Sequence, residues 1–491
     1  MVYIGAVEIT RKYFEQGWPY VAVYMLLLLE HGYLFGSNDQ MDFMPYARHL
    51  QDPSLYTSDF YINCISQQFN ERWLLGHLMA LIPHGVWPGF FLSVHFGCTV
   101  LLMAGMKKWA AHFVSSSAAQ WTAILITLIV LYHRNLGGNE LYYNMLTASN
   151  LAKAFAIWAL WYAFKGKTGP SSVLIALCTY FHPIVGAQVF TLSMILSPPG
   201  QNIRLAFISL ALILPYLLSL FIHLDESISA SLFSDIMFVR NAHHFFPASF
   251  GLINYILLAP FFLFGAYRFW IIDKRMAMML TVIMVGCLFY SLGILMMPKY
   301  VIMTQWFKTT IWLKFFCVVA TINWIKGLPN GSIMSYSIKP HFILFGLIIL
   351  FCVTKVIKNY WTDSPLYQLP WSQRSEDEKT AQNAKILSNQ NEVFLVPPDF
   401  TAFKYYAERS TYVDWKALPH NGVCLGDWWQ RISKVYGISL DDRGGLNSIY
   451  LKANDHLFRL TSEDKAEFKS RGITFIVFKS GQSGHYSIEK L

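Results

Sequence analysis

Two carboxylates stand where the first long apolar stretch ends, in the segment Ser37–Asp42. Asp39 and Asp42 head a polar loop that runs to about Arg72. A carboxylate in such a place can act as a general base or help to bind a divalent cation such as Mg²⁺ or Mn²⁺. Ionisable groups at the mouth of a membrane bundle are costly and usually mark a site. The alternative is that both acids are hydrated loop residues.

Other predicted loops carry cations and imidazoles that could meet an anionic substrate. Cationic side chains can bind phosphate, so this rim is a candidate site for an anionic group. The candidate substrate-binding residues are Arg134, Glu140, Arg240, His243, His244 and Lys299, with Gln305 and Lys308 close to the last. His243 and His244 are adjacent, so on a helix their rings diverge by about 100° and share a metal ion poorly. A structural hydrogen bond is the alternative role for one of them.

The C-terminal part adds three candidates, Arg409, Asp414 and Lys416. They follow a β-type run that ends at Pro397-Pro398. Ligands often approach open α/β sheets at the carboxyl ends of the strands. Arg409 and Lys416 are therefore candidates to contact an anionic head group, and a solvated surface is the alternative.

The composition excludes an ordinary soluble protein. Of 491 residues, 54% are hydrophobic and 14% are charged, against about 25% charged in soluble chains. The net charge of +9 comes from bases scattered singly and in pairs between apolar runs, which is typical of membrane flanks and disfavours nucleic-acid binding. Seven cysteines lie mostly within apolar stretches without a CxxC pair, so we expect neither a disulfide framework nor a zinc site.

Apolar stretches define the elements that must position these residues. A helix needs about 20 apolar residues to cross a bilayer. The predicted spans are 18–36, 87–105, 118–133, 150–164, 203–223, 251–270, 276–297, 309–325 and 341–357. A further stretch, 171–197, is interrupted at His182-Pro183. The polar start of the chain leads into the first span, so we expect an uncleaved anchor rather than a signal peptide.

The distribution of Lys and Arg predicts which loops face outward. Bases gather in one set of connections, whereas the loops 37–72, 134–148, 224–250 and 298–307 hold fewer bases and most of the acids. These sets fall on opposite faces if 171–197 is a broken hairpin that enters and leaves on the cytoplasmic side. Proline bends a helix and removes a backbone donor, so a break at Pro183 is favoured. If 171–197 crosses once, the later loops exchange sides.

The residues 358–491 differ from the rest of the chain and predict a second domain. Polar residues dominate 371–391, and β-type runs at 393–396 and 473–478 alternate with helical patterns near 374–388, 423–436 and 461–471. We therefore predict a mainly α polytopic membrane domain, 1–357, with about 9–11 membrane helices. A small extracytoplasmic α/β domain, 358–491, would follow it.

These features together resemble the GT-C superfamily of polytopic membrane glycosyltransferases. Asp39 and Asp42 match the acidic site of the first outer loop in that superfamily. The run Val396-Pro397-Pro398, Arg409 and the run Tyr412–Lys416, together with Arg240 and His243-His244, resemble an uncharacterised bacterial branch over most of the chain. The resemblance implies a bacterial inner-membrane enzyme whose C-terminal domain lies in the periplasm.

The resemblance also implies the reaction. A sugar would pass from a polyprenyl-phosphate or polyprenyl-diphosphate carrier to a glycan, lipid or protein acceptor, with Asp39 as general base and Asp42 orienting it or sharing a cation. No further cofactor is expected, and membrane lipids are the other partner. Two other functions stay open. One is a transporter or flippase of a lipid-linked or anionic solute, and the other is a non-catalytic subunit of an envelope polysaccharide assembly system.

Overall fold

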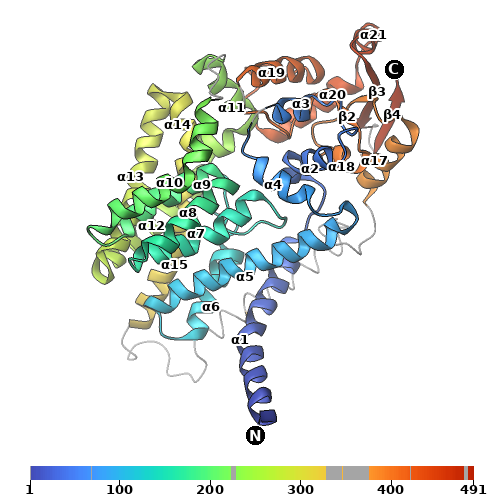
Figure 1. Cartoon of the computed structure of the whole chain (residues 1–491). Coiled ribbons are helices and arrows are strands. Elements are labelled where there is room, and N and C mark those ends of the chain that lie inside the picture. Colours follow the sequence, from blue (N-terminus) through green and yellow to red (C-terminus); the bar gives the residue numbers. More distant parts are fainter. Residues whose placement is uncertain are drawn as a thin grey trace.

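The computed structural model of the chain describes residues 2–67, 69–222, 228–327, 346, 375–420, 422–479 and 485–491. The described chain is mostly helical, and a small sheet lies in its C-terminal part (Figure 1). The predicted boundary at 357/358 and the predicted span 341–357, apart from position 346, lie outside the described residues.

The N-terminal part is built from helices of very different length. Its first half contains α1 (Val2–His31), the short 3-10 helix η1 (Asn38–Asp42), α2 (Met44–Gln51), α3 (Phe60–Ser66), α4 (Trp73–Ala80), η2 (His84–Val86), α5 (Trp87–Phe113), α6 (Ser117–Leu125) and the π-helical turn η3 (Ile126–Val130). Its second half contains α7 (Ala148–Phe164), α8 (Thr168–Phe181), α9 (Pro183–Leu196), α10 (Gln201–Ile222), α11 (Ala230–Phe245), η4 (Pro247–Ser249), α12 (Leu252–Ile272), α13 (Lys274–Met296), α14 (Pro298–Thr304), η5 (Trp306–Thr309) and α15 (Thr310–Gly327).

Four helical segments in the described part of the chain are long and apolar enough to cross a membrane. They are His84–Phe113, Gln201–Ser219, Leu252–Ile272 and Lys274–Met296. Large apolar side chains on three of these segments point outward; Phe207, Leu252 and Phe289 are 73%, 75% and 68% exposed. Exposed apolar surface of this extent favours contact with lipid over contact with water.

The other predicted spans fall on shorter or more interior helices. The segments Ser117–Val130, Thr168–Phe181 and Pro183–Leu196 are apolar but shorter than a full span. α15 is buried on nearly all sides from Thr310 to Ala320. A helix that is apolar all round belongs in the interior of a bundle. The predicted span 18–36 falls on α1, which ends at His31.

The break predicted inside 171–197 is confirmed. α8 ends and α9 begins at His182, whose φ of −152° and ψ of 95° are extended, and Pro183 occupies the first turn of α9. Each helix has 14 residues, or about 21 Å at 1.5 Å per residue. The two helices pack closely at the turn, since a Cβ on Gly186 would lie 2.2 Å from Thr179 Oγ1.

A small sheet forms the centre of the C-terminal part. Its strands lie in the order β2-β1-β3-β4, with β1 parallel to β2 and β3, and β3 antiparallel to β4. The elements in chain order are α17 (Glu376–Leu387), β1 (Val393–Leu395), α18 (Phe403–Ala407), β2 (Ser410–Thr411), α19 (Gly422–Tyr436), α20 (Leu446–Phe458), α21 (Ser462–Ser470), β3 (Ile473–Lys479) and β4 (Tyr486–Lys490). Both predicted strand regions and all three predicted helical regions are confirmed, whereas α18, α20, β2 and β4 were not predicted.

The C-terminal unit shares its apolar core with the first loop and with α11. Phe60 of α3 and Ile236 of α11 are buried in one cluster with Trp415, Trp428 and Ile476. Figure 1 shows α2 and α3, drawn in blue, among the orange and red C-terminal elements. The loop that carries the acidic pair is therefore folded against a surface supplied by residues more than 300 positions later in the chain.

The expectation of no disulfide is corrected by the structure. Cys64 of α3 is bonded to Cys424 of α19. The sequence pattern concealed this bond because the partners are 360 residues apart and belong to no short motif. The free cysteines among the described residues are Cys98, Cys178, Cys287 and Cys317.

Candidate functional site

The acidic pair lies on η1, and a buried glutamine fixes that helix. Gln40 is fully buried; its Oε1 accepts a hydrogen bond from Gly36 N at 2.7 Å, and its Nε2 donates to Leu146 O at 3.1 Å. With Gln40 held on one side of the short helix, its neighbour Asp39 points the other way. The Asp39 side chain is 46% exposed, so its carboxylate can meet a ligand.

Lys416 of the C-terminal unit reaches back to this carboxylate. Its Nζ lies 2.5 Å from Asp39 Oδ1. Burial raises the pKa of Asp39, but the charge and hydrogen bond of Lys416, together with Arg72 and Lys308, lower it more. The net pKa of Asp39 is below its ordinary value, so the carboxylate is ionised at neutral pH.

Arg240 positions the loop that carries Lys416. Its guanidinium donates from Nε to Trp415 O at 2.8 Å and from Nη2 to Lys416 O at 3.1 Å, and it stands 5.2 Å from the centre of the Trp415 ring. Asp414 Oδ1 accepts from Lys416 N at 2.8 Å. Arg240 is 5% exposed. Arg240 and Asp414 therefore hold the Lys416 backbone, and only the Lys416 side chain reaches the acidic pair.

Asp42 has its own cationic partner. Arg72 Nη2 lies 2.7 Å from Asp42 Oδ2. Burial raises the pKa of Asp42, Arg72 lowers it and Asp39 raises it, with a net rise. Environments that push the pKa values of two neighbouring carboxyls apart are a feature of acid–base sites. Asp42 Oδ1 and Arg72 Nε are buried and have no hydrogen-bond partner among the described residues.

A third ion pair extends the cluster beside Arg72. His420 Nδ1 lies 2.5 Å from Glu71 Oε1, and the His420 side chain is 54% exposed. The charge of Glu71 raises the pKa of His420. For Glu71, the imidazolium outweighs burial and lowers the pKa of the carboxyl. Glu71, Arg72 and His420 were not among the predicted site residues. The only signal for the first two was their place at the far end of the acidic loop.

Lys308 is the cation of this group that the protein leaves unpaired. It lies on η5, which is placed by the loop before α7: Asn139 Nδ2 donates to Lys308 O at 3.3 Å, and Gly137, at φ +82°, packs against Phe307. Lys308 Nζ makes no hydrogen bond or ion pair within the described ranges. Burial and Arg72 lower the pKa of Lys308 to about 8, although Asp39 acts in the opposite direction. An unpaired, partly desolvated ammonium beside a carboxylate is suited to an anionic ligand.

The two histidines of α11 lie side by side rather than apart. The helix has a non-helical residue, Asn241 (φ −141°), just before them, and the ring centres of His243 and His244 are 4.1 Å apart. His244 Nδ1 lies 3.2 Å from Gly137 O. His244 therefore has the structural hydrogen bond that was the alternative role for one of the two histidines. Burial, followed by the charge of Arg240, lowers the pKa of His243 to about 4. Its imidazole is therefore neutral at pH 7.

Four predicted site residues lie outside this cluster. Glu140 is buried and paired with Lys314 Nζ at 2.6 Å. Arg409 donates to Lys385 O at 2.8 Å and to Ser388 O at 2.7 Å, which joins α17 to β2. The other two are Arg134, whose side chain is exposed, and Lys299, whose Nζ donates to Ile228 O at 3.4 Å.

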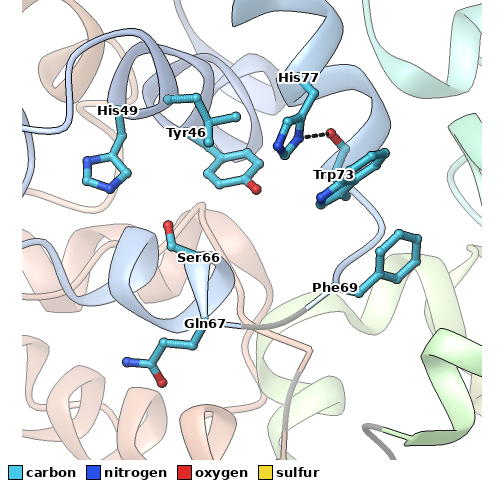
Figure 2. Close-up of a pocket in the computed structure, with 8 residues that line it drawn as sticks. Tyr46, His49, Ser66, Gln67, Phe69, Trp73 and His77 are labelled. Carbon is cyan, nitrogen blue, oxygen red and sulfur yellow. Dashed lines mark hydrogen bonds between the residues drawn. The ribbon is translucent and has the colours of Figure 1, made fainter.

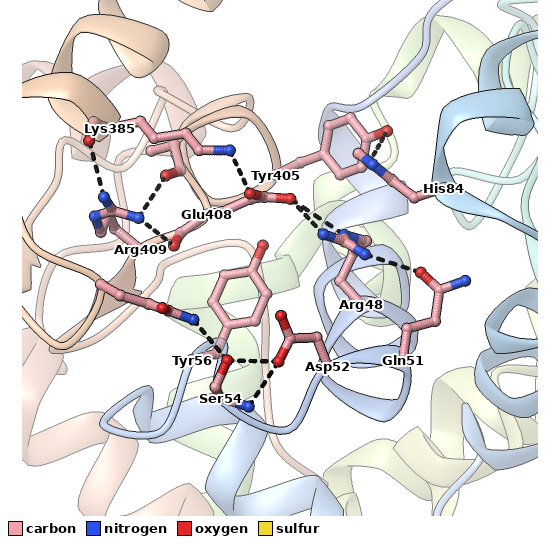
Figure 3. Close-up of polar contacts among 12 residues, drawn as sticks. Arg48, Gln51, Asp52, Ser54, Tyr56, His84, Lys385, Tyr405, Glu408 and Arg409 are labelled. Atoms are coloured by element: carbon pink, nitrogen blue, oxygen red, sulfur yellow. Dashed lines mark hydrogen bonds and ion pairs between the residues drawn. The ribbon is translucent and has the colours of Figure 1, made fainter.

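Buried ion pairs hold the acidic loop against the C-terminal unit. Asp59, with no exposed surface, lies 3.1 Å from Lys404 Nζ, and Lys404 also lies 3.4 Å from Asp414. Nearer the surface, Glu408 bridges Arg48, at 2.7 Å, and Lys385 (Figure 3). The acidic pair and Lys416 are therefore brought together by a fixed interface.

The described residues do not supply a closed set of metal ligands. No three His, Cys, Asp or Glu side chains come together as a metal-binding group in the described ranges. Asp39 and Asp42, the predicted pair, each face a protein cation instead, Lys416 and Arg72.

One segment of the chain is similar to a known protein family. Residues 375–435 match the family model described as a domain of unknown function, DUF6798. The matched segment runs from α17 to the last turn of α19 and contains Lys404, Asp414 and Lys416. The description of this family names no activity. No curated protein matches the chain.

Proposed function

We propose that this protein is a membrane glycosyltransferase that transfers a sugar from a polyprenyl-phosphate carrier to an acceptor on the extracytoplasmic face. One observation carries the proposal. A half-exposed, ionised carboxylate, Asp39, pairs with Lys416, and the charge of Lys308 also acts on it; both cations come from segments distant in the sequence. A base next to phosphate-binding cations is the minimum that glycosyl transfer from a lipid phosphate requires.

Asp39 is the proposed general base. It takes the proton of an acceptor hydroxyl while the oxygen forms a new bond to the anomeric carbon of the sugar. The bond from that carbon to the phosphate oxygen breaks, and the electron pair leaves with the lipid phosphate. The unpaired ammonium of Lys308 would stabilise the charge on the departing phosphate.

Lys416 has a second role in this scheme. Its ammonium lowers the basicity of Asp39 in the free protein. A bound phosphate would compete with Asp39 for Lys416, and a weaker ion pair raises the pKa of the carboxyl. Donor binding would thus make Asp39 a stronger base at the moment when the acceptor must lose its proton.

The disulfide supports the proposed location. Bonds such as Cys64–Cys424 persist in oxidising compartments, including the bacterial periplasm. The bond joins the first loop to the C-terminal unit, which are the two parts that the charge distribution assigns to the outer face. We therefore place both at the periplasmic side of a bacterial inner membrane.

The experiment measures sugar transfer by the purified chain in liposomes, with polyprenyl phosphate that carries radiolabelled glucose or mannose as donor. Asp39→Asn should lower turnover by about 10²–10⁴-fold, the usual contribution of a general base. Asp52→Asn is the matched control, since Asp52 lies in the same loop and its carboxylate bonds only to Ser54 in the contacts described. Equal transfer by Asp39→Asn and the parent would refute the assignment. Movement of the donor across the bilayer without a new glycosidic bond would favour a transporter.

A further inference from the structure

A separate cavity lies between the first loop and α4. Its volume is about 320 Å³, within the range of ligand pockets, about 300–1,000 Å³. Figure 2 shows the imidazoles and aromatic rings of α2 and α4 facing the polar end of α3. The lining residues are Tyr46, His49, Leu50, Ser66, Gln67, Phe69, Trp73 and His77.

The walls of this cavity are rigid where α2 meets α4. A Cβ on Gly76 would lie 2.5 Å from the Tyr46 ring, so the ring packs directly on the helix backbone. Gln51 Nε2 donates to the carbonyls of Ala80, at 3.2 Å, and Ile82, at 2.5 Å, and so ties the two helices together at their ends. Phe69 stands edge-on to Tyr216 of α10, at 5.3 Å between ring centres. The cavity is thus prearranged beside an apolar helix long enough to cross the membrane.

Both imidazoles have a fixed orientation. His49 Nδ1 lies 2.7 Å from Leu55 O, and His77 Nδ1 lies 2.8 Å from Trp73 O. Since a carbonyl only accepts, each Nδ1 must carry the proton, and each Nε2 is left as an acceptor in the neutral ring. Ser66 and Gln67 are exposed and add groups that both donate and accept.

The chemistry of the lining selects a neutral ligand rich in hydroxyl groups. Among the described residues, no Asp, Glu, Lys or Arg lines the cavity, so a phosphate or carboxylate would find no counter-charge from them. A lipid chain would leave the imidazole and amide groups without partners, which is costly. Trp73 is 38% exposed, and its ring packs on His77, at 4.3 Å between ring centres, and near Phe69, at 5.7 Å, so these rings form one aromatic wall of the cavity. A pyranose ring has C–H groups that pack on aromatic rings and hydroxyl groups that bond to polar side chains, and the cavity wall offers both kinds of partner.

The cavity adjoins the acidic pair through the chain itself. Arg72, which pairs with Asp42, immediately precedes Trp73. Tyr61 Oη donates to Asp42 O at 3.0 Å from α3, the helix whose end supplies Ser66. We infer that this cavity binds a neutral pyranose ring of the acceptor. This inference deepens the proposed function, on which the identification of the ring as acceptor rests.

The test is binding, measured without any transfer. Saturation-transfer NMR of the full chain in nanodiscs would use the methyl pyranosides of glucose, galactose, mannose and N-acetylglucosamine. At least one should bind, with the strongest signals from ring C–H protons. Trp73→Ala should weaken binding about tenfold or more because the ring loses its apolar platform. Trp324→Ala is the matched control, since Trp324 is also 38% exposed but lies on α15, and it should bind as the parent does.

A second variant covers the case in which Trp73→Ala fails to fold. Gln67→Ala truncates an exposed side chain and should weaken binding about three- to tenfold through a lost hydrogen bond. No signal from any of the four pyranosides, or equal binding by the parent and both cavity variants, would overturn the inference. Pyranoside binding without transfer by the parent would refute the proposed function and leave the sugar site standing.

Discussion

The sharpest stability prediction concerns Asp59, the buried carboxylate that joins the first loop to the C-terminal unit. Its Oδ1 accepts from Ile62 N at 3.0 Å and from Lys404 Nζ at 3.1 Å. Its Oδ2 accepts from Thr411 N at 2.9 Å and from Thr411 Oγ1 at 3.0 Å. In Asp59→Asn an NH₂ group replaces one oxygen, so a donor faces a donor, and Lys404 keeps only Asp414, at 3.4 Å.

The magnitude follows from these contacts. Removal of one partner of a buried ion pair costs about 3–5 kcal/mol. Because Asp414 remains, we expect the lower end, about 3 kcal/mol. The entropy of unfolding is about 2.1 cal/mol/K per residue, so a chain of 491 residues that unfolds as one unit shifts by about 1 °C per kcal/mol, and the Tm should fall by about 3 °C. Burial lowers the pKa of Lys404, but Asp59 and Asp414 raise it more, to a net rise. The stabilisation from this pair is therefore complete at neutral pH and is lost only as the pH rises above the pKa of Lys404.

The assay is thermal unfolding in detergent at pH 7, followed by tryptophan fluorescence. Asp455→Asn is the control, because Asp455 pairs only with Arg459 at 2.8 Å and its side chain is 53% exposed; exposed pairs contribute about 0–1 kcal/mol. Adding Lys404→Met to Asp59→Asn should restore part of the loss, since the stranded charge is then gone. The reasoning fails if Asp59→Asn and Asp455→Asn have the same Tm. It also fails if the loss of stability in the double variant equals the sum of the losses in Asp59→Asn and Lys404→Met.

Two further predictions concern Lys308 and the disulfide. The pKa of Lys308 is lowered to about 8, so kcat/KM for a polyprenyl-phosphate donor should fall as the pH rises through 8. Lys308→Arg should remove that fall. A kcat/KM of the parent that does not change with pH would contradict phosphate binding by Lys308. Without reductant, a maleimide should leave Cys64 and Cys424 unlabelled. Cys64→Ser should lower the free energy of unfolding by about 2–5 kcal/mol, with Cys98→Ser as control. Labelling of both cysteines in the unreduced protein would rule out the bond.

Local features of the chain were readable from the sequence. The break at His182-Pro183 and the strands near 393 and 473 depend on residues close together in the chain, and the structure has all three. Hydropathy predicted more spans than the four segments that are long and apolar enough among the described residues. Helices such as α15 are covered by neighbouring helices, and hydropathy alone does not distinguish an interior helix of a bundle from one that faces lipid.

For the site residues, too, residue type was predictable from the sequence, whereas the role of each side chain was not. The sequence picked out Asp39, Asp42 and Lys416 by residue type. Arg240 and Arg409 were predicted as ligand-binding residues together with Lys416. The sequence does not distinguish an arginine that binds a ligand from one that donates hydrogen bonds to backbone carbonyls. Burial separates them: Arg240 and Arg409 are 5% and 7% exposed, and both donate to carbonyl groups.

The amino-acid sequence by itself determined the apolar, mostly helical character of the chain, its sheet-containing C-terminal part and the acidic start of its first loop. Only the tertiary structure decided that Lys416 pairs with Asp39, that Cys64 bonds Cys424 and that residues of α2, α4 and the end of α3 line one cavity. Both pairings join residues more than 300 positions apart. Pairings at such a distance depend on how helices and strands pack, and no local pattern encodes that packing.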